Sequence, residues 1–264
     1  MVHAPRDRTR VLVRAALPRR HARLTVTRSV PALERRLRST LVDAVLVDLG
    51  APLGDPLRAT ALAREFPSIA FLAITPYRPV DAPAIAACVA HEVADVLADA
   101  VDDALLGRAL VAHGFSSRFA AALDEPPPAL RLTSVLQRDA WCCIVQHAGR
   151  VVRTRDLARS LAVTREHLSR TFAAGAAASL KRVIDLVRLL AAAELAKNPG
   201  FDLRDVARML GYASTSHLSA AARRLVGRPA GSLARLRGVE LIDGFVRAAV
   251  VSGGRSAGRV SGDA

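Results

Sequence analysis

RDLARSLAVTREHLSRTF, at residues 155–172, and RDVARMLGYASTSHLSAAARRLVGRP, at residues 204–229, are two versions of one local pattern. In each copy, apolar residues spaced i, i+1 and i+4 predict a short amphipathic helix. A hydroxyl residue, Thr164 or Ser214, then stands where it can cap a second helix. A helix, a short turn and a capped second helix predict a helix-turn-helix unit, whose second helix fits the major groove of DNA.

The segment between the two copies predicts a rigid spacer. Ser179 can cap a helix from Leu180 to about Ala196, and residues 198–200, Asn-Pro-Gly, end it. A helix of this length spans roughly 25 Å at about 1.5 Å per residue. With the widths of the flanking units, that length approaches one DNA turn of about 34 Å. The pattern therefore predicts two reading helices that enter successive major grooves on one face of the duplex.

This part of the chain resembles the DNA-binding domain of the AraC/XylS family of bacterial transcription regulators, from near Leu132 to Leu236. The resemblance rests on residues 156–158 and 164–172 of the first copy, and on residues 205–212, 216–218, 223–224, Gly227 and Pro229 of the second. It implies an all-α domain with two helix-turn-helix units joined by a linker helix. It also implies a transcription factor that binds double-stranded DNA sequence-specifically, with RNA polymerase as a further candidate partner.

The first reading helix, after Thr164, buries Leu168 and Phe172 if its period is helical. Four polar residues then face outward: Arg165, Glu166, Ser169 and Arg170. By the resemblance, Glu166, Ser169 and Arg170 occupy base-reading positions. Arg170 can form a forked contact with a guanine edge, and Glu166 can accept a hydrogen bond from a cytosine amine. A solvated surface charge is the alternative interpretation for each.

In the second reading helix the matching positions hold Thr215, Ser216 and His217. These side chains are short or neutral, so contact through water or with phosphates is as open as direct reading of bases. Further along, Arg223 and Arg224 are expected to reach phosphates or the adjoining helix.

The second copy departs from the family pattern at three points. Ala220 stands where a basic residue is usual, and Ala222 stands where Phe is usual. The segment Gly227-Arg228-Pro229 is one residue shorter than the usual Gly-x-x-Pro. We therefore predict that the second reading helix is less firmly packed than the first and a poorer reader of DNA.

The net charge of +14 is concentrated in the second half of the chain. Residues 1–130 carry 16 Lys and Arg against 14 Asp and Glu, whereas residues 131–264 carry 22 against 10. A surface that binds DNA phosphates needs such an excess. The Arg-rich, Ala-rich composition of chains from GC-rich genomes would give a basic protein without a functional cause, and charge alone does not decide between the two.

Length and composition exclude several other classes. The 264 residues suffice for two domains, and no apolar run approaches the roughly 18 residues of a membrane span. The N-terminus lacks the apolar core of a secretory signal, so we expect a cytoplasmic protein. Adjacent Cys142 and Cys143 lack zinc-ligand spacing, and they and Cys88 are expected to be buried small hydrophobes. No catalytic constellation or glycine-rich phosphate loop is present, which predicts no enzyme, cofactor or metal site.

The first half alternates strands with helices. Strands are predicted at residues 9–16, 23–28, 43–49, 69–74 and 94–97, and helices at 31–40, 56–65, 82–90 and 101–113. This alternation predicts a small, doubly wound parallel sheet of the flavodoxin-like or receiver-like kind.

Residues 47–52 resemble the phosphoacceptor turn of response-regulator receivers, with Asp48 in the acceptor position and Thr75 as the switch hydroxyl. A receiver needs a pair of acids after its first strand to hold Mg²⁺. The predicted first strand is instead followed by residues 14–16, Arg-Ala-Ala, and residues 98–100 offer no Lys. The first crossover is also too short for a helix. We predict a pseudo-receiver for homodimerisation or docking, with phosphorylation of Asp48 as the alternative.

We expect five segments. Residues 1–120 form the receiver-like domain, 121–131 a Pro-rich linker, 132–237 the DNA-binding domain, 238–251 an extra helix and 252–264 a disordered tail. Beside a sequence-specific regulator, two functions stay open. One is a docking scaffold with weak, nonspecific DNA binding, and the other is a phosphorylation-controlled response regulator.

Overall fold

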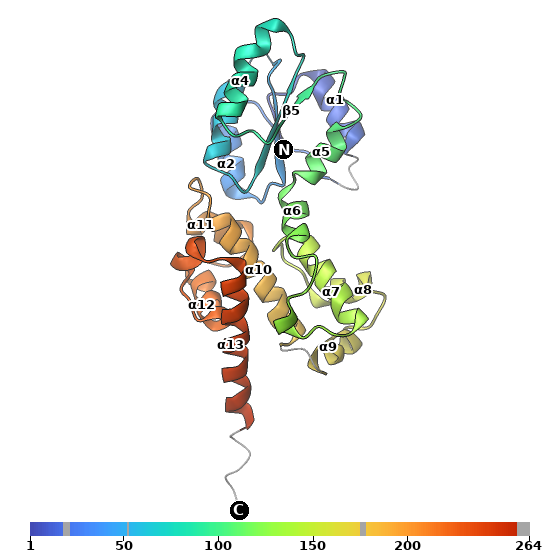
Figure 1. Ribbon diagram of the computed structural model, residues 1–264, viewed down its shortest axis with the longest axis vertical. Coiled ribbons are helices and arrows are strands. Elements are labelled where there is room, and N and C mark those ends of the chain that lie inside the picture. The colour runs from blue at the N-terminus through green and yellow to red at the C-terminus, as the bar shows by residue number, and fades with distance from the viewer. Residues whose placement is uncertain (18–21, 52, 175–177, 258–264) are drawn as a thin grey trace, which may run out of the picture. The chain divides into compact units, whose positions relative to one another are not determined.

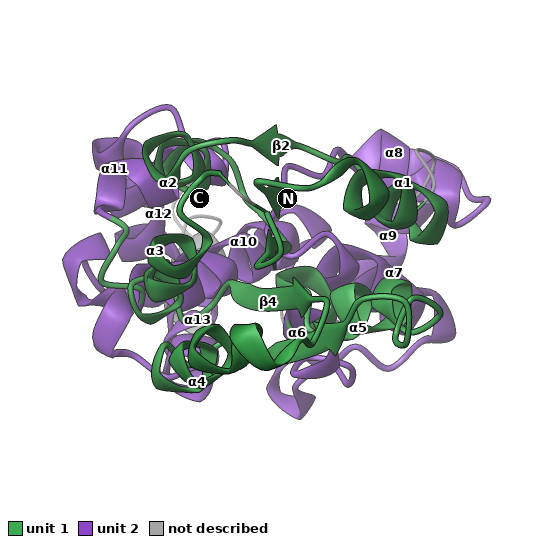
Figure 2. Ribbon diagram, turned by 90° about the horizontal axis from the view of Figure 1, so that it is seen from above, with its two compact units in different colours: residues 1–118, 198–201 green, residues 119–197, 202–264 purple. Residues whose placement is uncertain are grey.

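The chain folds into two compact units of different class (Figures 1 and 2). The computed structural model describes residues 1–17, 22–51, 53–174 and 178–257. Unit 1 comprises Met1–Arg118 with Asn198–Phe201, and unit 2 comprises Phe119–Lys197 with Asp202–Ala264. Unit 1 is α/β and unit 2 is helical, so the predicted fold class is confirmed.

A parallel sheet of five strands, in the order β2-β1-β3-β4-β5, forms the centre of unit 1. The strands are β1 Val2–His3, β2 Val26–Thr27, β3 Ala44–Asp48, β4 Ala70–Thr75 and β5 Asp95–Ala98. Every residue of β3 and β4 is buried, which is the pattern of strands that are covered on both faces. Their register pairs Leu46 with Leu72 and Asp48 with Ile74.

Helices cover both faces of this sheet. They are α1 Asp7–Ala16, α2 Val30–Ser39, α3 Pro56–Ala61 with the 3-10 turn η1 Leu62–Arg64, η2 Pro79–Asp81, α4 Ala82–Ala90 and α5 Leu106–Ala112; α6 Phe115–Ala121 follows. On one face, Val13 of α1 and Leu106 and Leu110 of α5 share a core with Leu46 and Leu72. Because side chains alternate along a strand, neighbours such as Val45 and Phe71 point to the other face, where α2, α3 and α4 lie (Figure 1).

The predicted strand at residues 9–16 is wrong, because this segment is helix α1. Its β-branched residues favour a strand, but the burial follows a helical period. Thr9 and Val13, four residues apart, are buried, whereas Val11 between them is 70% exposed. The first strand is Val2–His3, and α1 is the crossover helix that the sequence had seemed to lack.

The other predicted elements of this unit are present; the helix at 82–90 has the predicted bounds, and the rest are shifted. The helix expected at 56–65 divides into α3 and η1, and the one expected at 101–113 begins only at Leu106. The strand expected at 23–28 is reduced to Val26–Thr27.

Unit 1 also includes a short turn from much later in the chain. The Gly200 nitrogen donates to the Glu65 carbonyl oxygen at 2.8 Å, and the Phe201 ring lies 4.8 Å from that of Phe66. The Asn198 side chain accepts from the Ser68 nitrogen at 2.8 Å. The sequence predicted only that a helix ends at this turn.

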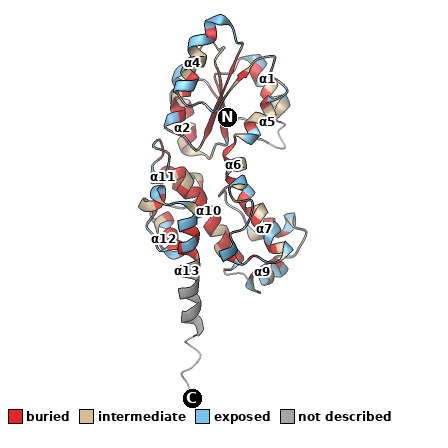
Figure 3. Ribbon diagram, in the orientation of Figure 1, coloured by how far each residue is buried: buried red, intermediate tan, exposed pale blue. Residues whose placement is uncertain are grey.

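Unit 2 is built around the long helix α10. Its elements are η3 Pro128–Leu130, α7 Val135–Gln146, α8 Thr154–Ser160, α9 Arg165–Ala173, α10 Leu180–Ala196, α11 Leu203–Met209, α12 Thr215–Val226, η4 Ala230–Arg235 and α13 Gly238–Ala257. Helix α10 packs against α9 and also against α11 and α12, and much of its surface is buried (Figure 3). Trp141 of α7 is fully buried in this unit, and its Nε1 donates to the Leu123 carbonyl oxygen at 2.8 Å.

Helix α13 is longer than the extra helix that the sequence predicted. It runs to Ala257 and packs on α12, and its side chains Leu241 and Phe245 are fully buried. The predicted disordered tail therefore begins as helix at residues 252–257, and residues 258–264 lie outside the described residues. None of the helices in the described ranges is both long and apolar enough to cross a membrane.

Candidate nucleic-acid interface

The two helix-turn-helix pairs, α8–α9 and α11–α12, repeat the same capping contacts. The Thr164 hydroxyl accepts from the His167 nitrogen at 3.1 Å, and the Ser214 hydroxyl accepts from the His217 nitrogen at 3.0 Å. Each satisfies one backbone donor at the start of its reading helix, as predicted. The third predicted cap is wrong: Ser179 precedes α10 in an extended conformation, but its side chain accepts no capping hydrogen bond.

The turns inside the two pairs repeat as well. The Val163 nitrogen donates to the Ala158 carbonyl oxygen at 3.0 Å, and the Tyr212 nitrogen donates to that of Ala207 at 2.8 Å. The residue before each donor is left-handed, with φ of 54° at Ala162 and 69° at Gly211. Each first helix therefore ends in the same backbone motif, although only the second copy has the glycine that adopts this conformation without strain.

The outward face of α9 is the one that the sequence predicted. Leu168 and Phe172 are fully buried against the unit. The four predicted contact residues, Arg165, Glu166, Ser169 and Arg170, are all exposed. Their spacing places them on one side of the helix, and none of their side chains bonds to another described residue. This surface offers two guanidinium groups, a carboxylate and a hydroxyl to an approaching ligand.

The outward face of α12 is more constrained. Thr215, Ser216 and His217 are exposed, as predicted. The Ala213 nitrogen donates to His217 Nδ1 at 3.3 Å, and the imidazole lies edge-on to the Tyr212 ring, with centroids 5.7 Å apart. Because Nδ1 accepts a hydrogen bond, the ring proton sits on Nε2. His217 therefore offers a single donor in a fixed orientation.

Sequence reasoning missed the contact that ties α10 to the second pair. The Arg188 guanidinium lies 3.8 Å from the centroid of the Tyr212 ring, and its Nε donates to the Leu210 carbonyl oxygen at 2.7 Å. Burial raises the pKa of Tyr212 to about 12. Since Tyr212 in turn supports His217, Arg188 is a positioning residue for the start of α12. Its place on the linker helix gave no local signal for this role.

The inner face of α12 is buried despite its departures from the family pattern. Ala222 is fully buried, as are Leu218 and Leu225 on the same face. A Cβ atom on Gly244 of α13 would lie only 2.9 Å from the Val226 carbonyl oxygen, so the two helices approach closely. The inner face of α12 is thus buried as completely as that of α9, and its looser packing stays a prediction. Its weaker reading of DNA stays a prediction.

Basic side chains gather where α12 ends. Arg224 NH2 lies 3.7 Å from Asp185 Oδ2 of α10, so this residue reaches the adjoining helix, whereas Arg223 is exposed. Arg224 also lines a cavity of about 580 Å³ with Arg228 and with Arg247 of α13. Sequence reasoning missed this cluster, because packing brings Arg247 to the other two.

In unit 1, the predicted phosphoacceptor is fully enclosed by donors. Asp48 is buried and accepts hydrogen bonds from the Arg6 nitrogen at 2.9 Å, Arg6 Nε at 3.0 Å and the Thr9 hydroxyl at 2.5 Å. The Gly50 nitrogen is a fourth donor at 3.1 Å. Arg6 NH2 also bonds to Asp99 Oδ2 at 2.9 Å. A guanidinium therefore neutralises this carboxylate.

Because β1 is the first strand, the pair of acids that a receiver needs would have to follow β1. Residues 4–7, Ala-Pro-Arg-Asp, follow β1 instead of residues 14–16. Asp7 is the one acid there, and its side chain is 97% exposed. Thr75 is buried and donates to Asp81 Oδ2 at 3.1 Å, while hydrogen bonds from Arg78 lower the pKa of Asp81 to about 2.

Two further predictions concern cysteines and metals. Cys88 is buried as expected, but Cys142 and Cys143 are only partly buried. Within the described ranges, no group of three His, Cys, Asp or Glu side chains is arranged to hold a metal ion.

A comparison with known families finds a match within the second unit. Residues 157–235 match the family model of a helix-turn-helix domain of the AraC type. The matched range runs from within α8 to η4 and contains α9, α10, α11 and α12, whereas residues 1–118 and α13 lie outside it. The match supports an AraC-family DNA-binding domain. A search of curated proteins finds no match to the chain.

Proposed function

We propose that this protein is a sequence-specific transcriptional regulator that reads two successive major grooves with α9 and α12. The observation that carries the proposal is that the two helix pairs repeat the same contacts. Both have the same turn hydrogen bond, the same hydroxyl cap and the same buried leucine, Leu168 or Leu218. The match to a helix-turn-helix family supports a DNA-binding domain, and the repetition supports two equivalent probes.

The linker helix supports the proposed spacing. Helix α10 has the predicted bounds, Leu180–Ala196, and contacts both pairs directly. Its 17 residues span roughly 25 Å, which with the flanking helices approaches one turn of DNA. The Arg188–Tyr212 contact restricts rotation of the second pair about this rod.

The exposed side chains of α9 and α12 support different roles for the two helices in DNA binding. Arg170 and Glu166 of α9 are unpaired among the described residues and match the chemistry of guanine and cytosine edges. On α12, Thr215, Ser216 and the single free donor of His217 suit phosphates or water-mediated contacts. We propose that Arg165 and Arg223 bind phosphates beside these two sites.

Arg170→Ala tests base reading. It should cost about 1–3 kcal/mol of binding free energy at one base position and relax the preference there. Sites selected from random DNA with the wild type and the variant measure this directly. Arg35→Ala, which removes an exposed charge from α2 of unit 1, is the control and should leave the selected motif unchanged. Equal loss of affinity for every sequence would contradict base reading by Arg170.

A docking scaffold with nonspecific DNA binding is the second candidate. The neutral, short side chains on the outer face of α12 favour it, because they carry little sequence information. A scaffold of this kind would enrich no motif in the same selection. RNA polymerase, and a second copy of the chain held through unit 1, are the protein partners that we propose for the regulator.

Phosphorylation of Asp48 is not part of the proposal. The carboxylate already accepts four hydrogen bonds, and Arg6 occupies the surroundings in which a metal ion would have to bind. We propose that unit 1 is a pseudo-receiver in which this ion pair is permanent.

A further inference from the structure

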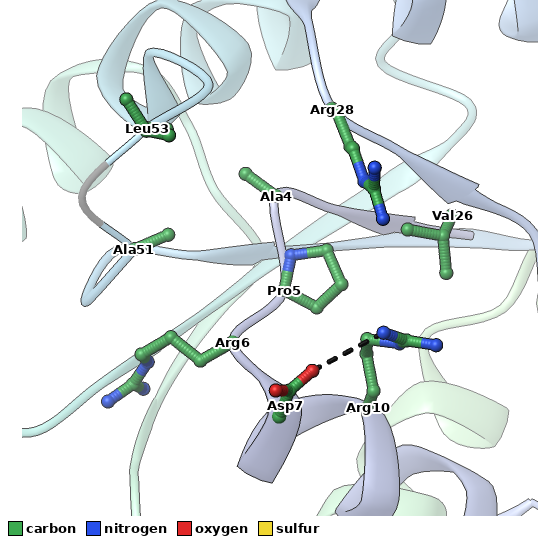
Figure 4. A pocket seen from close by; sticks show the side chains of 9 residues that line it. All are labelled: Ala4, Pro5, Arg6, Asp7, Arg10, Val26, Arg28, Ala51 and Leu53. Carbon is green, nitrogen blue, oxygen red and sulfur yellow. Dashed lines mark hydrogen bonds and ion pairs between the residues drawn. The ribbon is translucent and has the colours of Figure 1, made fainter.

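The α/β unit contains a cavity of about 290 Å³ that the DNA-binding function does not use (Figure 4). It is lined by residues at the carboxyl ends of β1 and β3, such as Pro5 and Ala51, and by Val26 and Arg28 at β2. The strand order reverses here, because β2 lies on one side of β1 and β3 on the other. In open parallel sheets, ligands bind in the crevice at this reversal point.

The lining of this cavity is strongly basic. Three arginines, Arg6, Arg10 and Arg28, line it together with one carboxylate, that of Asp7. Arg6 is already engaged by Asp48 and Asp99. Arg28 has no hydrogen bond or ion pair with another described residue, and it is exposed. The cavity therefore holds positive charge that the protein itself does not neutralise.

The one opposing ion pair is weak. Arg10 NH1 lies 3.3 Å from Asp7 Oδ1, and the two side chains are 51% and 97% exposed. Exposed pairs of this kind contribute little stability, so an incoming anion can replace Asp7 as the partner of Arg10 at little cost. Figure 4 shows the guanidinium groups of Arg10 and Arg28 on the same side of Pro5. The first turn of α1 begins at the same wall, which adds a favourable dipole for negative charge.

The remaining lining is apolar. Pro5, Val26 and Leu53 offer hydrocarbon surface beside the two guanidinium groups. Ligand pockets in proteins usually measure roughly 300–1,000 Å³, so this cavity suits a molecule at the small end of the range. Guanidinium forks pair with the planar or tetrahedral oxygens of carboxylates and phosphates.

We propose that this cavity binds a small organic anion, whose phosphate or carboxylate group lies between Arg10 and Arg28 and whose carbon skeleton packs on Pro5 and Val26. Asp48 takes no part, because its oxygens are occupied by Arg6, Thr9 and Gly50. The α/β unit is then a ligand-binding domain. It receives its signal by binding a small anion and not by phosphorylation.

Titration of the ¹⁵N-labelled full-length protein with inorganic phosphate and, separately, with succinate tests this proposal. Both are added at constant ionic strength, with sodium chloride as the third arm. We expect saturable shifts of the backbone amides of residues 6–10 and 28 with at least one of the two anions. A response to phosphate alone assigns a phosphate ester, and a response to succinate alone assigns a carboxylate.

Two variants make the test specific. Arg28→Ala should weaken the binding at least tenfold, because it removes the unpaired guanidinium from a position whose exposure leaves the fold intact. Arg35→Ala, an exposed arginine outside the cavity, should bind as the wild type does. Equal shifts with chloride, shifts confined to unit 2, or unchanged affinity in Arg28→Ala would each overturn the proposal.

Discussion

The two helix-turn-helix pairs share a backbone but differ in what they present to solvent. In both, a buried leucine, a hydroxyl cap and a left-handed turn residue fix the geometry. Helix α9 adds two arginines and a glutamate on its outer face, whereas the first turn of α12 offers hydroxyls and a histidine held by its own turn, and its exposed arginines lie at the other end of the helix. The two helix pairs therefore share a backbone scaffold, whereas the side chains on their exposed faces differ.

The largest effect should come from the shared inner face. Leu168→Ala and Leu218→Ala should each lower the free energy of unfolding by about 2–5 kcal/mol, because both side chains are fully buried. Urea denaturation of the full-length protein measures both changes. If the two pairs are equivalent scaffolds, the two losses should be similar. A loss below about 1 kcal/mol for Leu218→Ala alone would break the comparison, since a loosely packed helix tolerates such a cavity.

A smaller effect is expected when the family residue is restored in the core of α12. Ala222→Phe should destabilise the protein by about 1–3 kcal/mol, because Ala222 is fully buried and α13 packs closely on this helix. The thermal midpoint and the urea midpoint should both fall. A gain in stability would mean that the second pair has a cavity after all.

A small gain in DNA affinity is expected from a substitution on the outer face of the same helix. Ala220 is exposed, so Ala220→Arg should leave the free energy of unfolding nearly unchanged. It should strengthen DNA binding and steepen the dependence of affinity on salt concentration by about one counterion, as an added phosphate contact does. Arg35→Ala serves again as the charge control. Unchanged affinity and salt dependence would show that this position does not approach the backbone of DNA.

Local pattern explains which parts of the molecule the sequence predicted. The bounds of α10, the caps at Thr164 and Ser214, and the outward face of α9 depend on residues a few positions apart, so periodicity and capping chemistry reveal them. The sequence did not predict strand β1, because it has only two residues. Without β1, helix α1 was predicted as the first strand, and the first crossover was placed too late in the chain.

Other features of the molecule could not be predicted, because they depend on contacts between residues that are distant in the sequence. Arg6 meets Asp48 and Asp99 only once the sheet has formed, and Arg247 meets Arg224 only once α13 has packed on α12. The stacking of Arg188 on Tyr212 likewise depends on the register of α10 against the second pair. None of these pairs has a signature in sequence spacing.

The spacing of the two half-sites tests the central claim most directly. Sites selected from random duplex DNA should contain two short motifs whose centres lie about 10–10.5 base pairs apart, because two helices on one rod enter successive major grooves. The motif assigned to α9 should be the stronger of the two. A single motif, or two motifs at variable spacing or half a turn apart, would contradict the account.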